Sequence, residues 1–402
     1  MAEAAPLRGV RVLDLTRALS GPYATMILAD LGAEVLKVEI PGSGDEARGW
    51  GPPFVGGDAA YFLAANRNKR SVALDLKSAA GREAALALAD ASDVLVENFR
   101  PGTAERLGLG ADEVQRRNPR LVYCSVSGYG QDQPPRAAYD QIVQGGAGLM
   151  SVTGYPDGPP TRVGVAVADI VAGMFAAQTV TAALYERART GRGRRVDVAM
   201  QDAVIALLTV QAARYFATGE SPGREGNQHP TIAPYGTFAT ADGHLNLGVA
   251  NDSQWCRLCT GIGAAELAQD PRFVTNRDRL AARAELHAEL EPRLRGRTTA
   301  DWVDALEAVA VPAGAIRTVA EVFDDPGVRA RGMQVDFDDP ARGPVSVPGA
   351  PWRLDGADAP MHSPPPRLGE HTRAVLREVA GYDAERLDAL AGDGVIADAP
   401  PA

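Results

Sequence analysis

The stretch of residues 9–39, GVRVLDLTRALSGPYATMILADLGAEVLKVE, decides the fold of this chain. Its two ends, 9–15 and 33–39, are short apolar runs of the kind that form buried strands. Between them, residues 21–31 are predicted to form a helix, and Pro22 suits a helix's first turn. A strand, a helix and a second strand in this order predict a βαβ unit with parallel strands.

The same alternation continues for about the first half of the chain. A helix at 80–91 follows Ser78, a residue type that favours the N-cap. Further strands are predicted at 71–76, 93–98 and 121–126, and further helices at 111–117, 168–189 and 200–217. Repeated units of this kind predict an α/β fold with a mostly parallel, Rossmann-like sheet.

The composition changes at residues 218–234, where Gly, Pro, Ser, Asn and His gather. This segment is predicted to be a linker or an active-site loop. Two apolar runs, 235–240 and 244–249, then flank an Asp-Gly pair, which is typical of a β-hairpin. With the helices that follow to about residue 309, they predict a smaller α+β domain over 235–312.

The composition excludes several classes of function. The net charge is −10, which argues against nucleic acid or an anionic membrane as a partner. Three cysteines, Cys124, Cys256 and Cys259, give no disulfide framework, so we expect a reducing cytoplasm. Cys256 and Cys259 form a CxxC pair without a second pair or a His cluster, so we expect two neighbours on one helix face and no metal site. The first residues have no basic or apolar region, and we expect no signal peptide.

One segment, residues 163–185, is long and apolar enough to be tested as a membrane span, and it contains a single charged residue, Asp169. Ala, Val, Gly and Thr dominate it, no second span accompanies it, and Asp is costly at membrane depth. We therefore expect a helix buried in a globular core.

Asp169 is the most informative residue of the chain. No GxGxxG after the first strand, Walker A, HExxH or GxSxG motif is present, and there are only five histidines. Two compatible interpretations of Asp169 stay open. It caps or begins a helix, as buried acids at helix starts commonly do, or it is a carboxylate nucleophile whose charge the helix N-terminus steadies.

An ordered series of motifs then surrounds Asp169, with Ala172 and Gly173 close behind it. They are VLDLT at 12–16, SGP at 20–22, LGAEVLKVE at 31–39, GSGD at 42–45, RGW at 48–50, NKRS at 68–71, LDLK at 74–77, VENFRPG at 96–102, SGY at 127–129, TGRG at 190–193, MQDA at 200–203 and LGEHT at 368–372. In this order, over almost the whole chain, they resemble the class III CoA-transferases, the formyl-CoA transferase family.

The resemblance implies that Asp169 is the catalytic nucleophile. It also implies contacts with coenzyme A, the substrate that carries the acyl group, whose phosphates Lys77 and Arg106 would neutralise. Phe99 would offer CoA an apolar face. The full implied set is Leu19, Ser20, Leu74, Asp75, Lys77, Asn98, Phe99, Arg100, Arg106, Tyr139 and Met200.

The family's architecture implies an interlocked homodimer. Its large CoA-binding domain would combine residues 1–217 and 313–402, with 218–234 as the linker or active-site loop and 235–312 as the small domain. Acyl-CoA and a small carboxylic acid would be the substrates, with no permanently bound cofactor and no metal.

Three departures bear on the substrate. Leu19 stands where formyl-CoA members have Gln, Ile40 replaces an Arg, and the family's glycine run is replaced by the shorter 218–234 segment. Backbone or side-chain groups of Gly226, Asn227, Gln228 and His229 are candidates to stabilise an oxyanion. Residues 227–235 resemble members that act on succinyl-CoA and dicarboxylic acids, such as succinate–hydroxymethylglutarate CoA-transferase.

The implied reaction passes CoA from an acyl-CoA donor to an acid through an aspartyl anhydride and an aspartyl-CoA thioester. One alternative is an α-methylacyl-CoA racemase of the same fold, which uses a His/Asp pair for proton transfer. Here Tyr139 precedes Asp140 where the racemase has His. A non-catalytic CoA-binding subunit is the other alternative, against which the retained Asp169 argues.

Overall fold

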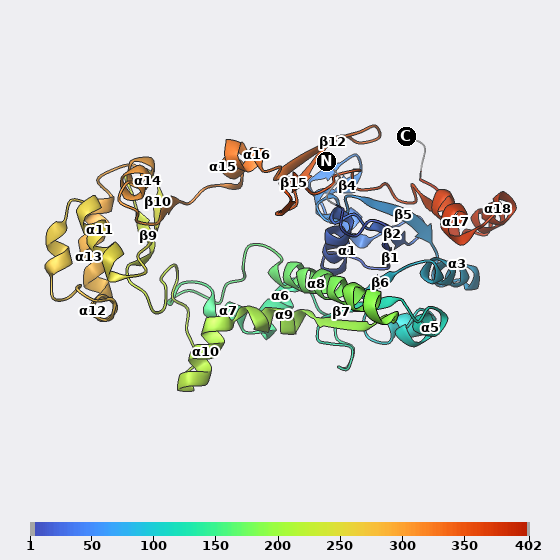
Figure 1. The fold of residues 1–402 in the computed structure, drawn as a ribbon, viewed down its shortest axis with the longest axis horizontal. Helices are drawn as coiled ribbons and strands as arrows, with labels where there is room; N and C mark the ends of the chain where they lie inside the picture. Colours follow the sequence, from blue (N-terminus) through green and yellow to red (C-terminus); the bar gives the residue numbers. More distant parts are fainter. Residues whose placement is uncertain (1–4, 400–402) are drawn as a thin grey trace. The chain divides into compact units, whose positions relative to one another are not determined.

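The computed structural model describes residues 5–399 and divides into two compact units (Figure 1). Of the described residues, unit 1 comprises 5–149, Arg162–Ala213 and 326–399, and unit 2 comprises Met150–Thr161 and Arg214–Asp325. These bounds differ from the predicted 217, 234 and 312. One reason is that strand β11 pairs with β10, which draws residues 313–315 into unit 2. Another is that Gly226 N–H donates to Gly154 O, which brings residues 150–161 there.

Unit 1 is built on a seven-stranded sheet in the order β16–β5–β2–β1–β6–β7–β8. All neighbours are parallel except β16, which runs antiparallel to β5. The prediction of a mostly parallel sheet is confirmed. The strands are β1 Arg11–Asp14, β2 Glu34–Glu39, β5 Lys69–Leu74, β6 Val94–Glu97, β7 Val122–Ser127, β8 Arg195–Ala199 and β16 Ile396–Ala397.

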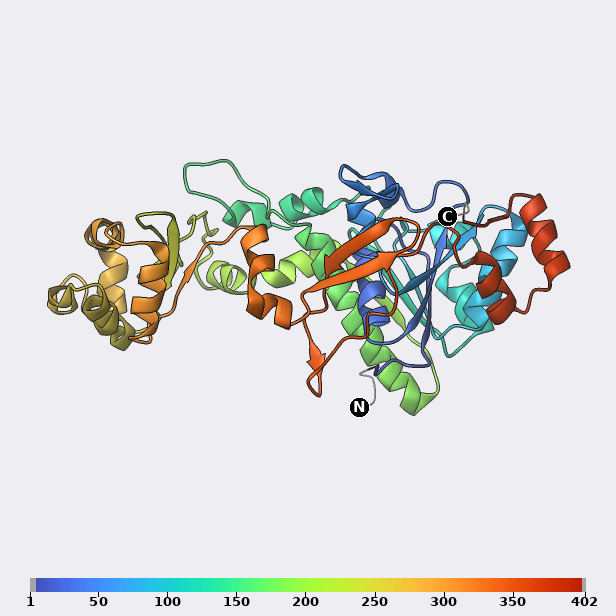
Figure 2. The ribbon, with the colours of Figure 1, turned by 90° about the horizontal axis from the view of Figure 1, so that it is seen from above.

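Helices cover both faces of this sheet, because successive strand residues point to opposite sides. Val12 packs on the face of α1 and α8, whereas Leu13 packs on the face of α3 and α17. Figure 2 shows the green α8 and the red α17 and α18 on opposite sides of the strands. The first face carries α1 Ser20–Asp30, α6 Asp140–Gly146, α8 Val167–Thr190 and α9 Met200–Leu207, and the second carries α3 Ala79–Asp90, α5 Ala111–Arg117, α17 Thr372–Ala380 and α18 Ala384–Gly392.

Helix α8 meets the length and hydropathy criteria for a membrane span. Its buried face, with Ala172, Ala176 and Val180, nevertheless packs in the same core as α1. Gly173 lies where the two helices meet, since a Cβ there would stand 2.6 Å from the Ser20 carbonyl oxygen. The expectation of a core helix in this segment therefore agrees with its packing.

The predicted single helix over 200–217 is wrong in one respect. The structure has two helices, α9 Met200–Leu207 and α10 Thr209–Thr218. Thr209 has a φ of 27°, and its hydroxyl donates to the Leu207 carbonyl oxygen over 3.3 Å. A threonine hydroxyl that competes for a helix carbonyl favours such a break.

Unit 2 contains the predicted hairpin, β9 Tyr235–Ala239 and β10 His244–Gly248, which pair antiparallel. β11 Ala313–Ala315 extends it to three strands. A core that includes Trp255 and Phe273 joins this sheet to the helices of the unit. Cys256 and Cys259 both lie on α11, so the predicted helix is present, but the first is exposed and the second buried, so they do not share one face. The helices are α11 Asp252–Gly261, α12 Asn276–Ala281, α13 Arg283–Leu294, α14 Thr299–Glu307 and α15 Val319–Asp324.

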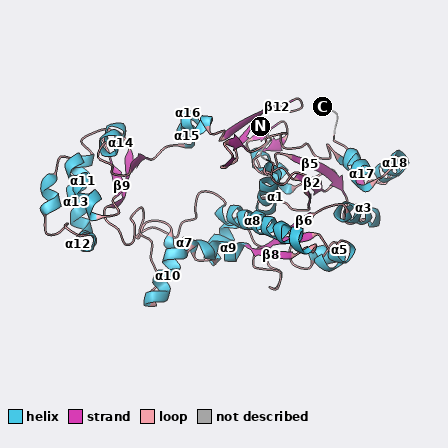
Figure 3. Ribbon diagram, viewed as in Figure 1, coloured by secondary structure: helices cyan, strands magenta, loops and turns pink. Residues whose placement is uncertain are grey.

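Short elements complete the described chain (Figure 3). The hairpin of β12 Gln334–Asp339 and β13 Gly343–Pro348 packs with Phe62 in a small separate core of unit 1. The others are η1 Glu46–Gly49, β3 Phe54–Val55, β4 Asp58–Ala59, α2 Ala60–Leu63, α4 Thr103–Arg106, α7 Leu149–Val152, η2 Ala265–Gln269, α16 Pro326–Ala330, β14 Arg353–Leu354 and β15 Ala357–Asp358.

Candidate active site

A cavity of about 590 Å³ opens at the carboxyl ends of β1, β6 and β7 in unit 1. The chain adds β2 and β5 on one side of β1 and then β6, β7 and β8 on the other. Ligands bind in the crevice that such a reversal creates at the carboxyl edge of an α/β sheet. The cavity is lined by the segments that follow β1, β6 and β7, with Arg17, Asn98 and Ser127 among them.

Asp169 lines this cavity from the first turn of α8. It lies at the helix start, as one interpretation predicted, but it does not cap the helix. Asp140 of α6 does so instead, because its Oδ1 accepts from the Ala168 N–H over 2.9 Å. The Oδ2 of Asp140 accepts from Gln144 Nε2 over 2.7 Å, so both of its oxygens are engaged. The carboxylate of Asp169 is thereby free of a capping role.

The surroundings of Asp169 raise its pKa to about 7. Burial has the largest effect, because it disfavours the charged form, and the negative charge of Asp140 adds to it. Hydrogen bonding from the hydroxyl and the backbone N–H of Ser20 acts in the opposite direction. Ser20 is the first residue of α1, where unpaired N–H groups and the helix dipole favour an anion.

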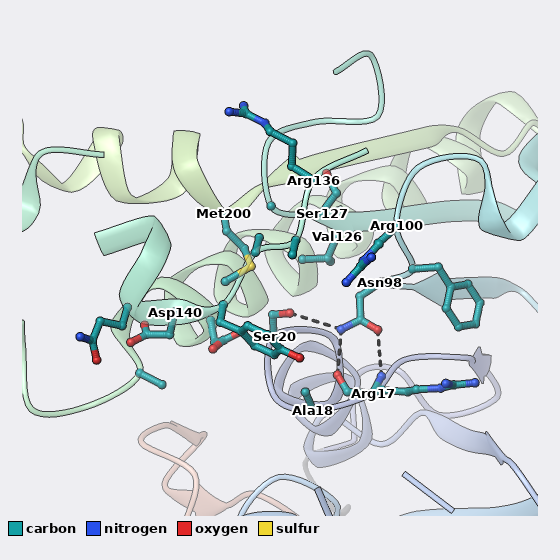
Figure 4. A pocket seen from close by; sticks show the side chains of 18 of the residues that line it. Arg17, Ala18, Ser20, Asn98, Arg100, Val126, Ser127, Arg136, Asp140 and Met200 are labelled. Atoms are coloured by element: carbon teal, nitrogen blue, oxygen red, sulfur yellow. Dashed lines mark hydrogen bonds between the residues drawn. The ribbon is translucent and has the colours of Figure 1, made fainter. Parts of the chain in front are cut away.

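The loop between β1 and α1 is held in place by side chains from neighbouring segments. Asn98 accepts from Arg17 N–H and donates to Arg17 O, each over 2.8 Å, and its Nδ2 lies 3.5 Å from Ser20 Oγ (Figure 4). Ala18, at a φ of 63°, donates its N–H to Asp45 Oδ1 over 3.0 Å. The buried Lys37 fixes Asp45 in turn through a 2.9 Å ion pair. These bonds place Ser20 against Asp169.

Two aromatic side chains form part of the cavity wall. The rings of Trp50 and Tyr61 lie edge to face with centroids 5.1 Å apart. Burial and then the charges of Asp169 and Asp140 raise the pKa of Tyr61 to about 12. The Tyr61 hydroxyl therefore stays protonated near the Asp169 carboxylate.

Four arginines line the cavity, although the chain as a whole carries a net charge of −10. Arg136 stacks over the ring of Tyr129 at 3.8 Å, and Arg17 lies 5.5 Å from the ring of Phe99. None of the four forms an ion pair with a carboxylate among residues 5–399. Such guanidinium groups are suited to anionic ligands, phosphates above all. The four are Arg17, Arg100, Arg136 and Arg162.

The structure brings together many of the residues that the sequence nominated. Leu19 lines a neighbouring cavity instead. The residues that line the Asp169 cavity itself are Ser20, Asn98, Phe99, Arg100, Tyr139, Asp169 and Met200.

Besides Leu19, four nominated CoA contacts do not line this cavity. The Leu74 side chain is buried in the core on the second face of the sheet. Asp75 and Lys77 lie in the turn before α3, where Lys77 N–H donates to Asp75 Oδ1 over 2.9 Å. Arg106 is exposed and donates to Thr103 Oγ1 over 2.8 Å. Their contacts with CoA stay predictions.

The nominated oxyanion loop belongs to unit 2. The side chain of Asn227 donates to the Tyr155 hydroxyl over 3.2 Å. Gln228 Oε1 lies 3.1 Å from His287 Nε2, and the His229 ring stacks on Tyr235 with centroids 5.0 Å apart. Gly226 has a positive φ of 60°. The oxyanion role of these residues stays a prediction.

Sequence reasoning did not nominate several residues that complete the cavity. Arg17 lies in the loop just after β1, a place where a site residue is expected in an α/β sheet, and that signal could have found it. The others came with no comparable signal of a site, although Trp50 stood in the RGW motif, because each is a single residue of a loop or a short helix. They are Trp50, Tyr61, Arg136, Asp140 and Arg162.

Comparison with known proteins agrees with this geometry. Residues 7–372 match the model of CoA-transferase family III. The succinyl-CoA:glutarate CoA-transferase of Mus musculus is 42% identical over 97% of this chain and 90% of that protein. The acetyl-CoA:oxalate CoA-transferase of Acetobacter aceti is 43% identical over 94% and 97% of the two chains. The crystal structure of a CAIB/BAIF family protein from Brucella suis has a TM-score of 0.85 and 43% identity, and covers 94% of this chain and 100% of that one.

A cavity lined by arginines at the carboxyl edge of an α/β sheet suits an anionic substrate. The chain belongs to CoA-transferase family III. It is therefore a CoA-transferase, and CoA thioesters are its substrates, as the resemblance predicted.

Proposed function

We propose that this enzyme moves CoA from succinyl-CoA, or a similar dicarboxylyl-CoA, to a carboxylic acid through the side chain of Asp169. One observation carries the role of Asp169. Its carboxylate faces the cavity with no cationic partner among residues 5–399, and the capping of α8 is left to Asp140. The name of the mouse relative, which acts on succinyl-CoA and glutarate, supports the choice of acids.

The proposed reaction begins when an Asp169 oxygen attacks the thioester carbonyl carbon. The carbon–sulfur bond breaks, and a mixed anhydride and the CoA thiolate result. The thiolate then attacks the Asp169 carbonyl carbon, which releases the donor acid and leaves an aspartyl-CoA thioester. The acceptor carboxylate attacks that thioester, CoA leaves again, and the thiolate takes the acyl group from the second anhydride. Every intermediate stays activated for acyl transfer.

Ser20 is well placed for the steps in which the Asp169 carbonyl is attacked. Its hydroxyl and N–H already interact with the carboxylate, at the N-terminus of α1. An oxyanion that develops on the same oxygen would receive the same donors. Ser20, nominated as a CoA contact, is thus also proposed to stabilise this oxyanion. The oxyanion role of Gly226, Asn227, Gln228 and His229 is kept as a separate proposal.

CoA is proposed to enter along the four arginines of the cavity. Its phosphates carry several negative charges, and guanidinium groups bind phosphate with paired N–H donors. Phe99 lies in the same wall and offers an apolar face. Lys77 and Arg106, which the resemblance implies, would extend this contact at the outer surface.

The racemase alternative is disfavoured by the state of Asp140. That reaction needs a His/Asp pair with a proton to exchange at the substrate's α-carbon. Tyr139 replaces the His, and both oxygens of Asp140 are engaged by Ala168 and Gln144. Asp140 is thus a structural cap here.

We also propose that the enzyme is a homodimer, interlocked as the family resemblance implies, that works in the cytoplasm. Large apolar side chains stand exposed on α8, α9 and α10, and contiguous exposed apolar surface marks interaction sites. They include Met174, Tyr185, Ile205, Leu207 and Val210. The three cysteines are all free, which suits a reducing compartment. Light scattering of the purified enzyme would measure the mass, and a monomer would contradict the dimer.

A trapping experiment tests the covalent role of Asp169. Incubation with succinyl-CoA alone, followed by hydroxylamine, should convert Asp169 to a hydroxamate that peptide mass spectrometry locates. The Asp169→Asn variant should show no hydroxamate and no transfer, whereas a control at the exposed Asp132, Asp132→Asn, should behave like the wild type. An unmodified Asp169 in the wild type, or transfer activity in Asp169→Ala, would contradict the proposal.

A further inference from the structure

A second cavity of about 400 Å³ lies beside the first, also within unit 1. It is predominantly apolar, unlike the arginine-lined cavity that holds Asp169. Its walls come from α1, from the start of α8 and from the chain after β13, and include Leu19, Met26, Ile27, Val165, Ile170 and Trp352.

The two cavities meet at the reacting group. Tyr61 and Ala166 line both of them. Ala166 and Ile170, from the second cavity, flank Asp169 within one turn of α8. The charge of Asp169 also contributes to the raised pKa of Tyr61, which places that phenol near the carboxylate. An acyl group attached to Asp169 would therefore begin at the junction of the two spaces.

The second cavity also has a polar end. Arg67 lines it together with Asp30, and the two form a buried ion pair with Nη2–Oδ2 at 2.5 Å and Nε–Oδ1 at 3.1 Å. Arg67 Nη1 donates to Pro348 O over 2.8 Å. Tyr23 lies close to this pair, since the charges of Arg67 and Asp30 act on the pKa of its hydroxyl. Tyr23 O–H and the remaining N–H groups of Arg67 are donors at that end.

We propose that this second cavity binds the acyl chain of the acid, while CoA occupies the first. This inference rests on the proposed function and names the substrate class. Methylene groups would pack on the apolar walls, and the distal carboxylate would meet Tyr23 and Arg67. A volume of about 400 Å³ equals that of about thirteen waters at about 30 Å³ each. The cavity thus has room for the methylene chain of glutarate or adipate, whereas oxalate has no methylene group to pack there.

Chain-length selectivity follows from this arrangement. Each methylene buried in an apolar site contributes about 0.8 kcal/mol, which is about fourfold in kcat/KM. The wild-type enzyme should therefore prefer glutarate over malonate with a common succinyl-CoA donor.

Filling the cavity tests this selectivity. Val165 is 57% exposed, so Val165→Phe can add bulk at the cavity mouth without disturbing the core. The variant should lower the glutarate-to-malonate ratio of kcat/KM at least fivefold and change malonate less than twofold. Val319→Phe, at a position that is 76% exposed on α15, is the matched control and should leave the ratio unchanged. An unchanged ratio in Val165→Phe, or an equal loss for both acids, overturns the inference.

A second variant tests the polar end. Tyr23→Phe removes only the hydroxyl, so it should lower kcat/KM for glutarate several-fold and leave valerate, which lacks the second carboxylate, unchanged. Equal effects on both acids would show that Tyr23 does not meet the distal carboxylate. The outcomes separate the two proposals. An enzyme that transfers CoA to no acid refutes the proposed function, whereas transfer without chain-length selectivity refutes the acyl cavity alone.

Discussion

Replacing Asp169 by Asn should stabilise the protein at alkaline pH while abolishing its activity. The reason is the energy of holding a carboxylate in a buried position next to another acid. Burial and the Asp140 charge raise the pKa of Asp169 from 3.8 to about 7. A shift of about 3 units corresponds to about 4 kcal/mol of disfavour for the charged form. Asparagine is neutral at every pH and does not carry this energy.

The direction in which the free energy of unfolding changes with pH follows from proton linkage. The folded pKa lies above the unfolded one, so the folded state holds a proton that the unfolded state releases between about pH 4 and 7. Wild-type stability from this group is therefore lost as the pH rises through that window. Integrating the two titrations gives a loss of about 2 kcal/mol at pH 5 and about 4 kcal/mol at pH 8. The advantage of the variant should grow by about 2 to 3 kcal/mol between these pH values.

Urea denaturation at pH 5 and pH 8 measures this difference, with tryptophan fluorescence as the signal. Asn keeps one acceptor for Ser20 and loses the other, at about 1 kcal/mol, but that loss is the same at both pH values. The increment between pH values thus isolates the ionisation of Asp169. Asp132→Asn, at an exposed site, should show no increment. An Asp169→Asn advantage that is flat or that shrinks from pH 5 to pH 8 would refute the reasoning.

Three further predictions concern the same site. Because the ionised carboxylate is the nucleophile, kcat/KM should fall tenfold per pH unit below about pH 7. Asp140→Asn removes a like charge and should move this fall in kcat/KM to lower pH. Coinciding pH–rate profiles of the two enzymes would count against the predicted shift. Gly173→Ala should destabilise the fold by about 1–3 kcal/mol in the same urea assay, because its Cβ would stand 2.6 Å from the Ser20 carbonyl oxygen. The control Gly146→Ala, whose Cβ would meet open space, should be neutral or stabilising. Asn98→Ala should reduce kcat/KM more than Asn98→Asp does, since Asp keeps the acceptor for the Arg17 N–H. Equal losses of kcat/KM in both variants, measured by steady-state kinetics, would contradict the role of Asn98 in holding the loop between β1 and α1.

The sequence predicted the fold well wherever a segment was apolar enough to leave a periodic pattern. The helix over 111–117 and the Ser78 cap were placed as the structure has them. β8 was not predicted, because Arg195 and Asp197 point to solvent at the sheet edge and mask its buried residues. The break before Thr209 was missed too, since it depends on one backbone angle that the surrounding helical composition does not reveal.

The candidate site was predictable only in part, for a different reason. Asp169 was visible because it is a charge within an apolar run, and Asn98 and Phe99 because a family motif contains them. The capping of α8 by Asp140 joins residues 28 positions apart, and no local pattern encodes such a contact. Three of the cavity's arginines, Arg17, Arg136 and Arg162, are likewise single residues from separate loops, which only the folded sheet brings to one edge.

The capping of α8 by Asp140 explains why the Asp169 carboxylate is unfavourable as an anion and still useful in the proposed reaction. If Asp169 capped its own helix, its charge would be satisfied by backbone N–H groups, and its pKa would be held low. Because Asp140 occupies that place, Asp169 keeps a raised pKa of about 7 and stays poorly satisfied as an anion. In the proposed reaction, both the anhydride and the aspartyl-CoA thioester are neutral at this side chain. Acylation therefore removes a buried charge that disfavours the free enzyme by about 4 kcal/mol, and that relief favours the covalent intermediates over the resting carboxylate.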